Sequence, residues 1–208
     1  AFLQPLLERG DLHFVLRSGG AVELLAELRA LNLDVVLMDR LPAAGPGPAL
    51  VGHRVARQLA TDYRLVLPDL RGYGDSSHAP GLHDHRNYSK RAMAQDVVEV
   101  ANALGIDDFF LCGHDRGGRV AHRLAVDHPT RVRRLCVLDI APTLDMYNRT
   151  DMDFARAYYH WFHLIQPSPL PEKMIAGNVL NYLHTKLGGW GSDGTSFIEP
   201  EAMAEYER

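Results

Sequence analysis

The stretch FFLCGHDRGGRVAHRLAVDHP, residues 109–129, decides the fold. Its apolar run ends at Gly113, Asp115 follows, and Gly117 and Gly118 come directly before a run with helical spacing. The pattern glycine–x–residue–x–glycine, set between an apolar strand and an amphipathic helix, is typical of a sharp turn that lifts one side chain above the carboxyl edge of a sheet. Glycines are required there because backbone segments pass close to one another. The stretch therefore predicts a strand and a helix joined by a tight turn with Asp115 at its apex.

The neighbouring segments predict a parallel sheet. Strands are expected over the apolar runs 63–69, 108–113 and 133–140, and helices over 89–105 and 118–129. Strands that are apolar along their whole length are typical of a parallel sheet that is covered on both faces. We therefore expect an α/β fold with a mostly parallel sheet and helices on both faces.

The helix expected over 89–105 has recognisable ends. Ser89 is a favourable N-cap residue, and Gly105 is a typical stop. Helical spacing predicts the residues of its buried face, which are Met93, Val97, Ala101 and Leu104.

The composition changes after residue 145, which predicts a second domain. Residues 150–166 form an aromatic-rich helical pattern, and residues 187–197 are a glycine-rich loop before a final short helix. We expect an α/β core over 1–145, atypical in its first part at 1–52, and a partial helical cap over 146–208.

Composition and charge exclude several classes of function. The formal net charge of −4 over 208 residues predicts neither nucleic acid nor an anionic membrane as a partner. No apolar run approaches the ~18 residues that a membrane span needs. Cys112 and Cys136 lie in apolar runs, and free buried thiols are typical of the reducing cytoplasm. We therefore expect a cytoplasmic protein.

The polar residues near 68–85 are expected to shape their own loop. His78, His83 and His85 are close in sequence, but no second cluster of ligands completes a metal site. We expect no metal and no cofactor, and we expect Asp69 and Arg71 to organise the turn in which they lie.

Asp115 is the candidate catalytic residue. A carboxylate nucleophile suits displacement at an sp³ carbon, because the resulting alkyl–enzyme ester can then be hydrolysed by water. The alternative is structural, since aspartate is also a favoured N-cap residue of a helix.

Arg116 and Arg119 narrow the substrate class. They are three residues apart at the start of a helix and therefore share a face. A substrate carboxylate ~4 Å from an ionised Asp115 is repelled by about 1 kcal/mol in water and by about 4 kcal/mol at an effective dielectric of 20. A guanidinium fork that holds the substrate carboxylate cancels this repulsion. The two arginines thus favour a small anionic substrate, with ordinary surface solvation as the alternative.

Several motifs together resemble one family. They are PDLRGYGDSS (68–77), NYSKRAMAQD (87–96), GHDRGGRVAHRLAVDHP (113–129), RRLCVLDIAPTLDMY (133–147) and DFARAYYHWFHLIQPSPLPE (153–172). The chain resembles the haloacetate dehalogenases of the α/β-hydrolase superfamily, with fluoroacetate dehalogenase as the nearest activity, from about His53 to its end. The arginine after the elbow aspartate is the discriminating residue, because the related haloalkane dehalogenases and epoxide hydrolases usually have tryptophan there.

The resemblance implies roles for four core residues. Asp115 is the nucleophile that displaces halide from the α-carbon. Arg116 and Arg119 hold the substrate carboxylate, and Asp139 orients a catalytic histidine. A structural alternative for Asp139 is that it caps the turn after its strand.

The resemblance also implies two residues of the cap. His160 and Trp161 match residues that donate hydrogen bonds to the leaving halide. Donors aimed at charge that develops in the transition state are the effective kind. The structural alternatives are a packed histidine and a tryptophan of the cap core.

The first fifty residues depart from the family. Residues 21–32 have a helical pattern and 34–38 suit a strand, but 20–52 as a whole resembles the family poorly. Asp39 and Arg40 stand where the family has the histidine and glycine of a His-Gly-x-Pro loop.

The end of the chain is the second departure. The histidines after Asp139 are His160, His163 and His184, and none has the sequence context of the family's catalytic base. We expect a C-terminally truncated chain and, as in the family, a possible homodimer. Two alternatives to a haloacetate dehalogenase stay open: an epoxide hydrolase-like enzyme with an aspartate nucleophile, and an inactive fragment without the catalytic histidine.

Overall fold

A computed structural model describes part of the chain and divides it into two compact units. The described residues are 35–37, 59–60, 62–74, 76–189, 194–196, 198 and 200–207. Among them, the first unit ends at Asp145 and the second begins at Met146. The helix expected over 21–32 and the departure at Asp39 and Arg40 lie outside the described residues.

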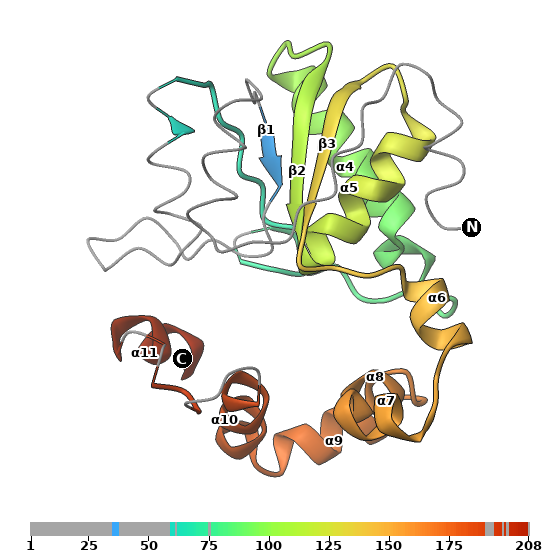
Figure 1. Ribbon diagram of the computed structural model, residues 1–208, viewed down its shortest axis with the longest axis vertical. Coiled ribbons are helices and arrows are strands. Elements are labelled where there is room, and N and C mark those ends of the chain that lie inside the picture. The colour runs from blue at the N-terminus through green and yellow to red at the C-terminus, as the bar shows by residue number, and fades with distance from the viewer. Residues whose placement is uncertain are drawn as a thin grey trace. The chain divides into compact units, whose positions relative to one another are not determined.

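The described strands of the first unit form a parallel sheet in the order β1-β2-β3 (Figure 1). The strands are β1 (Val35–Leu37), β2 (Phe109–His114) and β3 (Val132–Leu138). All pairings are parallel, and His114 of β2 lies opposite Leu138 of β3. The predicted parallel sheet is therefore confirmed, as are the strands expected near 34–38, 108–113 and 133–140.

The helix α4 (Lys90–Ala103) follows the short 3₁₀ helix η1 (Arg86–Tyr88). The Ser89 hydroxyl oxygen accepts a hydrogen bond from the Ala92 N–H at 3.2 Å, so the predicted N-cap is confirmed. Gly105 has a φ of 68°, which is the left-handed conformation that ends many helices. The expectation for Leu104 was wrong: it is the C-cap residue, beyond the last helical turn, and it is 41% exposed.

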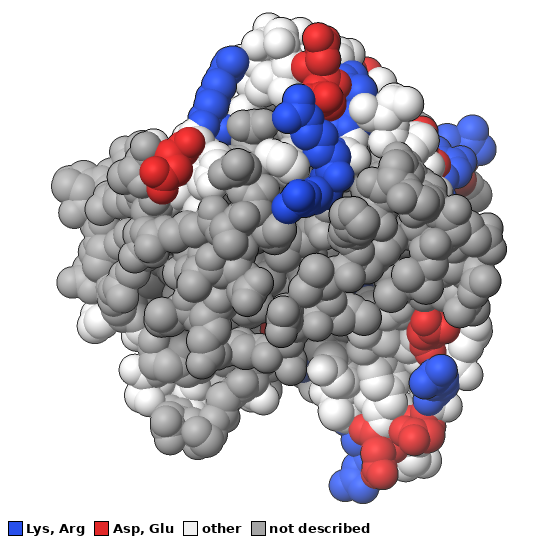
Figure 2. Space-filling model, turned by 45° about the horizontal axis from the view of Figure 1, so that its top comes forward, with Lys and Arg blue, Asp and Glu red and all other residues white. Residues whose placement is uncertain are grey.

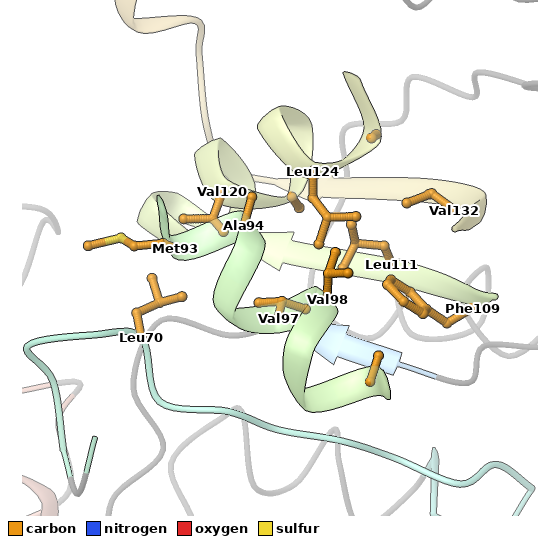
Figure 3. Close-up of a cluster of buried hydrophobic side chains, with 13 residues drawn as sticks. Leu70, Met93, Ala94, Val97, Val98, Phe109, Leu111, Val120, Leu124 and Val132 are labelled. Atoms are coloured by element: carbon orange, nitrogen blue, oxygen red, sulfur yellow. The ribbon is translucent and has the colours of Figure 1, made fainter. Parts of the chain in front are cut away.

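One face of the sheet packs against α4 and α5 (Asp115–Asp127). Figure 3 shows this core, in which side chains of both helices meet those of β2 and β3. The largest contributors are Phe109 and Leu111 from β2, Val120 and Leu124 from α5, and Met93 and Val97 from α4. Because α5 begins directly after β2, this packing fixes the position of the strand–helix turn.

The other face of the sheet packs against residues 59–67. Cys112 and Leu59 are buried there, with Leu65 and Leu67 partly buried beside them. The strand expected over 63–69 was wrong, because residues 64–70 have no regular secondary structure. The side chains of this segment still alternate between two sides, since Leu65 and Leu67 pack beside Cys112 and Val66 packs against the core formed with α4 and α5. A strand also needs a hydrogen-bonded ladder, and this segment forms none with the described strands.

The described part of the second unit is helical. Its helices are α7 (Met152–Ala157), α8 (Tyr159–Leu164), α9 (Leu170–Ala176), α10 (Val179–Gly188) and α11 (Pro200–Glu207), and α6 (Thr143–Asn148) spans the boundary between units. The helical pattern expected over 150–166 forms two helices: Tyr158, at φ −112° and ψ 34°, leaves the helical conformation and separates α7 from α8. Among the helices that are described, none has the length and hydropathy of a membrane span.

Candidate active site

Asp115 occupies a strained turn between β2 and α5. It is the first residue of α5 and has a φ of 44°, in the left-handed region that side chains with a Cβ rarely adopt. Such a conformation costs on the order of 1–3 kcal/mol and persists when the surrounding structure holds it. The strand ladder on one side and the buried helix on the other provide that support. The predicted turn with Asp115 at its apex is confirmed.

Two glycines make this turn possible. A Cβ on Gly113 would overlap the carbonyl group of Gly117 and lie 2.7 Å from the Gly118 nitrogen. A Cβ on Gly118 would lie 2.8 Å from Cγ2 of Ile140, in the segment that follows β3. The glycines thus allow the helix to approach both the strand before it and the loop beside it.

Asp115 does not act as the helix cap. The N-cap residue of α5 is His114, at φ −110° and ψ 143°, and its side chain makes no capping hydrogen bond. The N-cap alternative for Asp115 was therefore wrong.

Asp139 lies at the same edge of the sheet. It directly follows Leu138, whose partner in the adjacent strand is His114, the residue before Asp115. Neighbouring strands are about 4.8 Å apart, so the two aspartates leave adjacent strands at one level. Asp139 also has a φ of 44° and is exposed.

The two arginines lie within the first two turns of α5. Arg116 is exposed, and its guanidinium carbon is 5.9 Å from the centroid of the Tyr73 ring, a cation–π contact. Arg119 is half-buried. The first unit thus places Asp115 and Asp139 at the carboxyl edge of the sheet, and the two arginines in the part of α5 that follows Asp115.

The turn that carries Tyr73 is organised by polar contacts. Arg71 donates to both carboxylate oxygens of Asp96 in α4, at 3.0 and 2.6 Å, and to the Asn87 carbonyl at 2.8 Å. The hydrogen bond with Asp96 raises the pKa of Arg71. The Ser76 hydroxyl donates to the Asp69 carbonyl at 2.7 Å. The expected structural role of Arg71 is confirmed, although the sequence did not reveal Asp96 as a partner, and Asp69 contributes its backbone carbonyl to the turn.

A pocket of about 270 Å³ lies between this turn and α4. Its polar lining includes Asp69, Arg71, Ser76 and Asp96, and none of the predicted catalytic or substrate-binding residues contributes to it. Since Arg71 and Asp96 pair with each other, the pocket is bounded by the contacts that hold the turn.

The first unit also contains two cysteines in adjacent strands. Cys112 and Cys136 are free thiols at paired positions of β2 and β3, the former buried and the latter half-buried. A hydrogen bond with Cys136 and burial raise the pKa of Cys112.

Among the described residues, no group of three or more histidines, cysteines or acids is arranged to hold a metal ion. Figure 2 shows basic and acidic side chains beside one another on the described parts of one face.

His160 and Trp161 belong to the second unit. Both are in α8 and are half-buried. The Trp161 ring packs among aromatic neighbours, with centroid distances of 5.4 Å to Tyr147 and 6.0 Å to Phe154. Trp161 is therefore part of an aromatic cluster, as its structural alternative implied.

His160 has a polar partner that sequence reasoning missed. Its Nδ1 atom is 3.3 Å from Nζ of Lys186, a residue of α10 that lies 26 positions away. No local sequence signal links the two residues, because the contact joins side chains of two helices that are distant in the sequence.

The fold, with this strand–elbow–helix, agrees with the comparisons. The family model described as alpha/beta hydrolase fold matches residues 43–176. The chain belongs to the α/β-hydrolase fold family.

Individual relatives are similar over much of the chain. A fluoroacetate dehalogenase from Burkholderia sp is 47% identical over 175 residues, which are 79% of this chain and 58% of the relative. A soluble epoxide hydrolase from Corynebacterium sp. (strain C12) is 42% identical over 86 residues, 41% of this chain and 28% of the relative. The chain thus spans little more than half the length of the fluoroacetate dehalogenase that it matches.

Solved structures give the same result. A candidate α/β hydrolase from Nostoc sp PCC 7120 has a TM-score of 0.74 and 51% identity, covering 84% of this chain and 58% of that one. A variant of a candidate epoxide hydrolase from Pseudomonas aeruginosa, solved with bound MFA, has a TM-score of 0.71 and 38% identity, covering 85% and 57%. These similarities support the fold. They do not distinguish a haloacetate dehalogenase from an epoxide hydrolase.

Proposed function

We propose that this chain belongs to an enzyme that removes halide from a haloacetate by hydrolysis, giving glycolate and halide ion. The observation that carries the proposal is the carboxylate of Asp115 at the elbow, followed at once by Arg116 and one turn later by Arg119. The proposed nucleophile and the two cations thus lie within the first two turns of one helix.

The reaction has two steps. In the first, a carboxylate oxygen of Asp115 attacks the α-carbon, and the new C–O bond forms as the carbon–halogen bond breaks. The halide leaves with the bonding electron pair, and the substrate is held as an ester of Asp115. In the second, water attacks the ester carbonyl and gives a proton to a histidine base oriented by Asp139. The tetrahedral intermediate then collapses, the departing glycolate oxygen takes up that proton, and the Asp115 carboxylate is restored. The family resemblance implies this histidine, and none of His160, His163 and His184 has its sequence context.

The arginines account for selection of an anionic substrate. A guanidinium offers a planar fork that matches a carboxylate, and the N-terminus of α5 also favours negative charge. Binding the substrate carboxylate there places a negative ligand beside a negative nucleophile without net repulsion. The 47% identity to a fluoroacetate dehalogenase supports the same assignment.

His160 and Trp161 are proposed as donors to the leaving halide. A halide gains charge as the bond breaks, so an N–H directed at it stabilises the transition state more than the ground state. A homodimer and a cytoplasmic location stay predictions.

Epoxide hydrolysis is the second candidate. The 42% identity to a soluble epoxide hydrolase favours it, and the same carboxylate attack opens an epoxide ring to an ester intermediate. Arg116 argues against it, because a neutral epoxide gains nothing from a carboxylate-binding fork.

A substrate panel separates the two candidates. The chain is incubated with chloroacetate, neutral chloroacetamide and styrene oxide, and bound and released products are measured by mass spectrometry and ion chromatography. We expect reaction with chloroacetate and at least about tenfold less with chloroacetamide, the factor for 1.4 kcal/mol. Equal reaction with chloroacetate and chloroacetamide would overturn the haloacetate assignment, and reaction with styrene oxide alone would favour the epoxide class.

A further inference from the structure

Lys186 of α10 contacts two residues at the start of α8. Its Nζ atom is 3.3 Å from Nδ1 of His160 and 3.9 Å from the centroid of the Tyr159 ring. The second contact is a cation–π interaction, which holds an ammonium group over the face of an aromatic ring. Both contacts lie within the second unit.

The contact with Nδ1 determines where the imidazole proton resides. An ammonium group has three N–H donors and no acceptor. Nδ1 of His160 must therefore accept the hydrogen bond, and it cannot carry a proton of its own. A neutral imidazole has one N–H, so that proton lies on Nε2.

We propose that Lys186 is a positioning residue that holds neutral His160 in its Nε2–H tautomer. This inference rests on the proposed function, in which His160 donates to the leaving halide. With the opposite tautomer, Nε2 would present a lone pair to the halide and repel it.

The surroundings hold the imidazole ring in place for this role. The Tyr158 ring is 6.0 Å from it with a 30° interplanar angle, and the Tyr159 ring is 6.1 Å away and nearly perpendicular. Nearby on α10, His184 bonds the Glu207 carboxylate at 2.6 Å. His184 and Lys186 are two positions apart and face different directions on the helix. Glu207 therefore pairs with His184 on a different face of α10 from Lys186.

The tautomer is directly measurable. The ring nitrogens of the ¹⁵N-histidine-labelled chain are observed by NMR at a pH where His160 is neutral, and the shift of each nitrogen reports whether it carries a proton. We expect the Nε2–H tautomer in the unchanged chain and in Lys186→Arg, which also only donates. In Lys186→Glu we expect Nδ1–H, because a carboxylate only accepts. Lys173→Glu, on the exposed surface of α9, is the matched control for the charge change and should leave His160 unchanged.

A second measurement links the tautomer to the reaction. We expect Lys186→Glu to slow halide release from chloroacetate by about 10²–10³-fold, the usual effect of losing one transition-state donor, and Lys186→Arg to restore most of the rate. A neutral His160 with Nδ1–H in the unchanged chain, or the same tautomer in Lys186→Glu, would overturn the inference whatever the activity. An Nε2–H tautomer in a chain that never reacts with chloroacetate would instead refute the proposed function.

Discussion

Asp115 and Asp139 leave the adjacent parallel strands β2 and β3 at the same level. The residue before Asp115 is His114, the residue before Asp139 is Leu138, and these two residues are paired in the sheet. Both aspartates have a φ of 44°. Two carboxylates are thus delivered to the same edge of the sheet by matching backbone turns. In the proposed reaction, the carboxylate of Asp115 attacks the substrate and that of Asp139 positions a base.

The close approach at Gly113 predicts the effect of adding one methyl group. Gly113→Ala places a Cβ against the carbonyl of Gly117, so we expect the free energy of unfolding to fall by about 1–3 kcal/mol. Urea unfolding measures this change. Gly177→Ala is the control, because its nearest atoms are at 3.5 Å and its φ is −64°. An unchanged free energy of unfolding in Gly113→Ala would contradict the close contact between Gly113 and the Gly117 carbonyl.

The left-handed conformation of Asp115 predicts an inverted order of stability. Glycine adopts this φ without steric cost, whereas alanine retains its Cβ penalty of roughly 1–2 kcal/mol. We expect Asp115→Gly to be more stable than Asp115→Ala by about 1 kcal/mol, although alanine is the better helix former. Thermal or urea unfolding of the two variants compares them directly, and a more stable alanine variant would contradict the strained turn.

The Asp127 carboxylate predicts a pH dependence of stability. It bonds Arg123 within α5 and Arg91 of α4, and the hydrogen bond with Arg123 lowers its pKa below the ordinary 3.8. A lowered native pKa stabilises the fold above the ordinary carboxyl pKa, and this contribution is lost as pH falls through the lowered value. Asp127→Asn should cost about 1 kcal/mol at neutral pH and progressively less in acid.

Asp108→Asn serves as the control for that experiment. The Asp108–Arg133 pair is more exposed, with side chains that are 40% and 54% accessible, so its loss should change the free energy of unfolding less. Equal and pH-independent losses in both variants would contradict the role of Asp127.

The proposed fork predicts a difference between arginine and lysine at position 119. Lysine keeps the charge but offers a point donor in place of a planar fork. We expect Arg119→Lys to slow the reaction with chloroacetate about tenfold or more, while Arg134→Lys, on the exposed surface of β3, leaves it unchanged. Initial rates of halide release over a range of chloroacetate concentrations test this, and equal rates in all three proteins would remove Arg119 from the substrate site.

Local patterns in the sequence were sufficient for the elbow and the sheet. The glycines at 113, 117 and 118 and the apolar runs beside them predict the turn, because steric limits at a strand–helix junction act over a few residues. The same local reasoning placed Leu104 on a buried face. A helical period does not say where the last turn ends, and Leu104 lies just beyond it.

Contacts between residues that are distant in the chain could not be predicted from local sequence patterns. Residues 63–69 alternate like a strand, but the ladder that would define one depends on a partner far away in the chain. Lys186 and His160 lie 26 positions apart in the sequence and meet through their side chains in the folded chain, and nothing in either local sequence marks the pair. The assignment of His160 therefore came from a family resemblance, and the proposal for its tautomer rests on the contact with Lys186.

The measurement that tests the account most directly is the mass of the chain after reaction with chloroacetate and rapid acid quench. The account predicts the mass of one added carboxymethyl group, located by peptide mapping on Asp115, with an equal amount of chloride released. Asp115→Asn should show no adduct, because an amide is a poor nucleophile. An adduct that persists in Asp115→Asn, or that maps to another residue in the unchanged chain, would contradict Asp115 as the nucleophile.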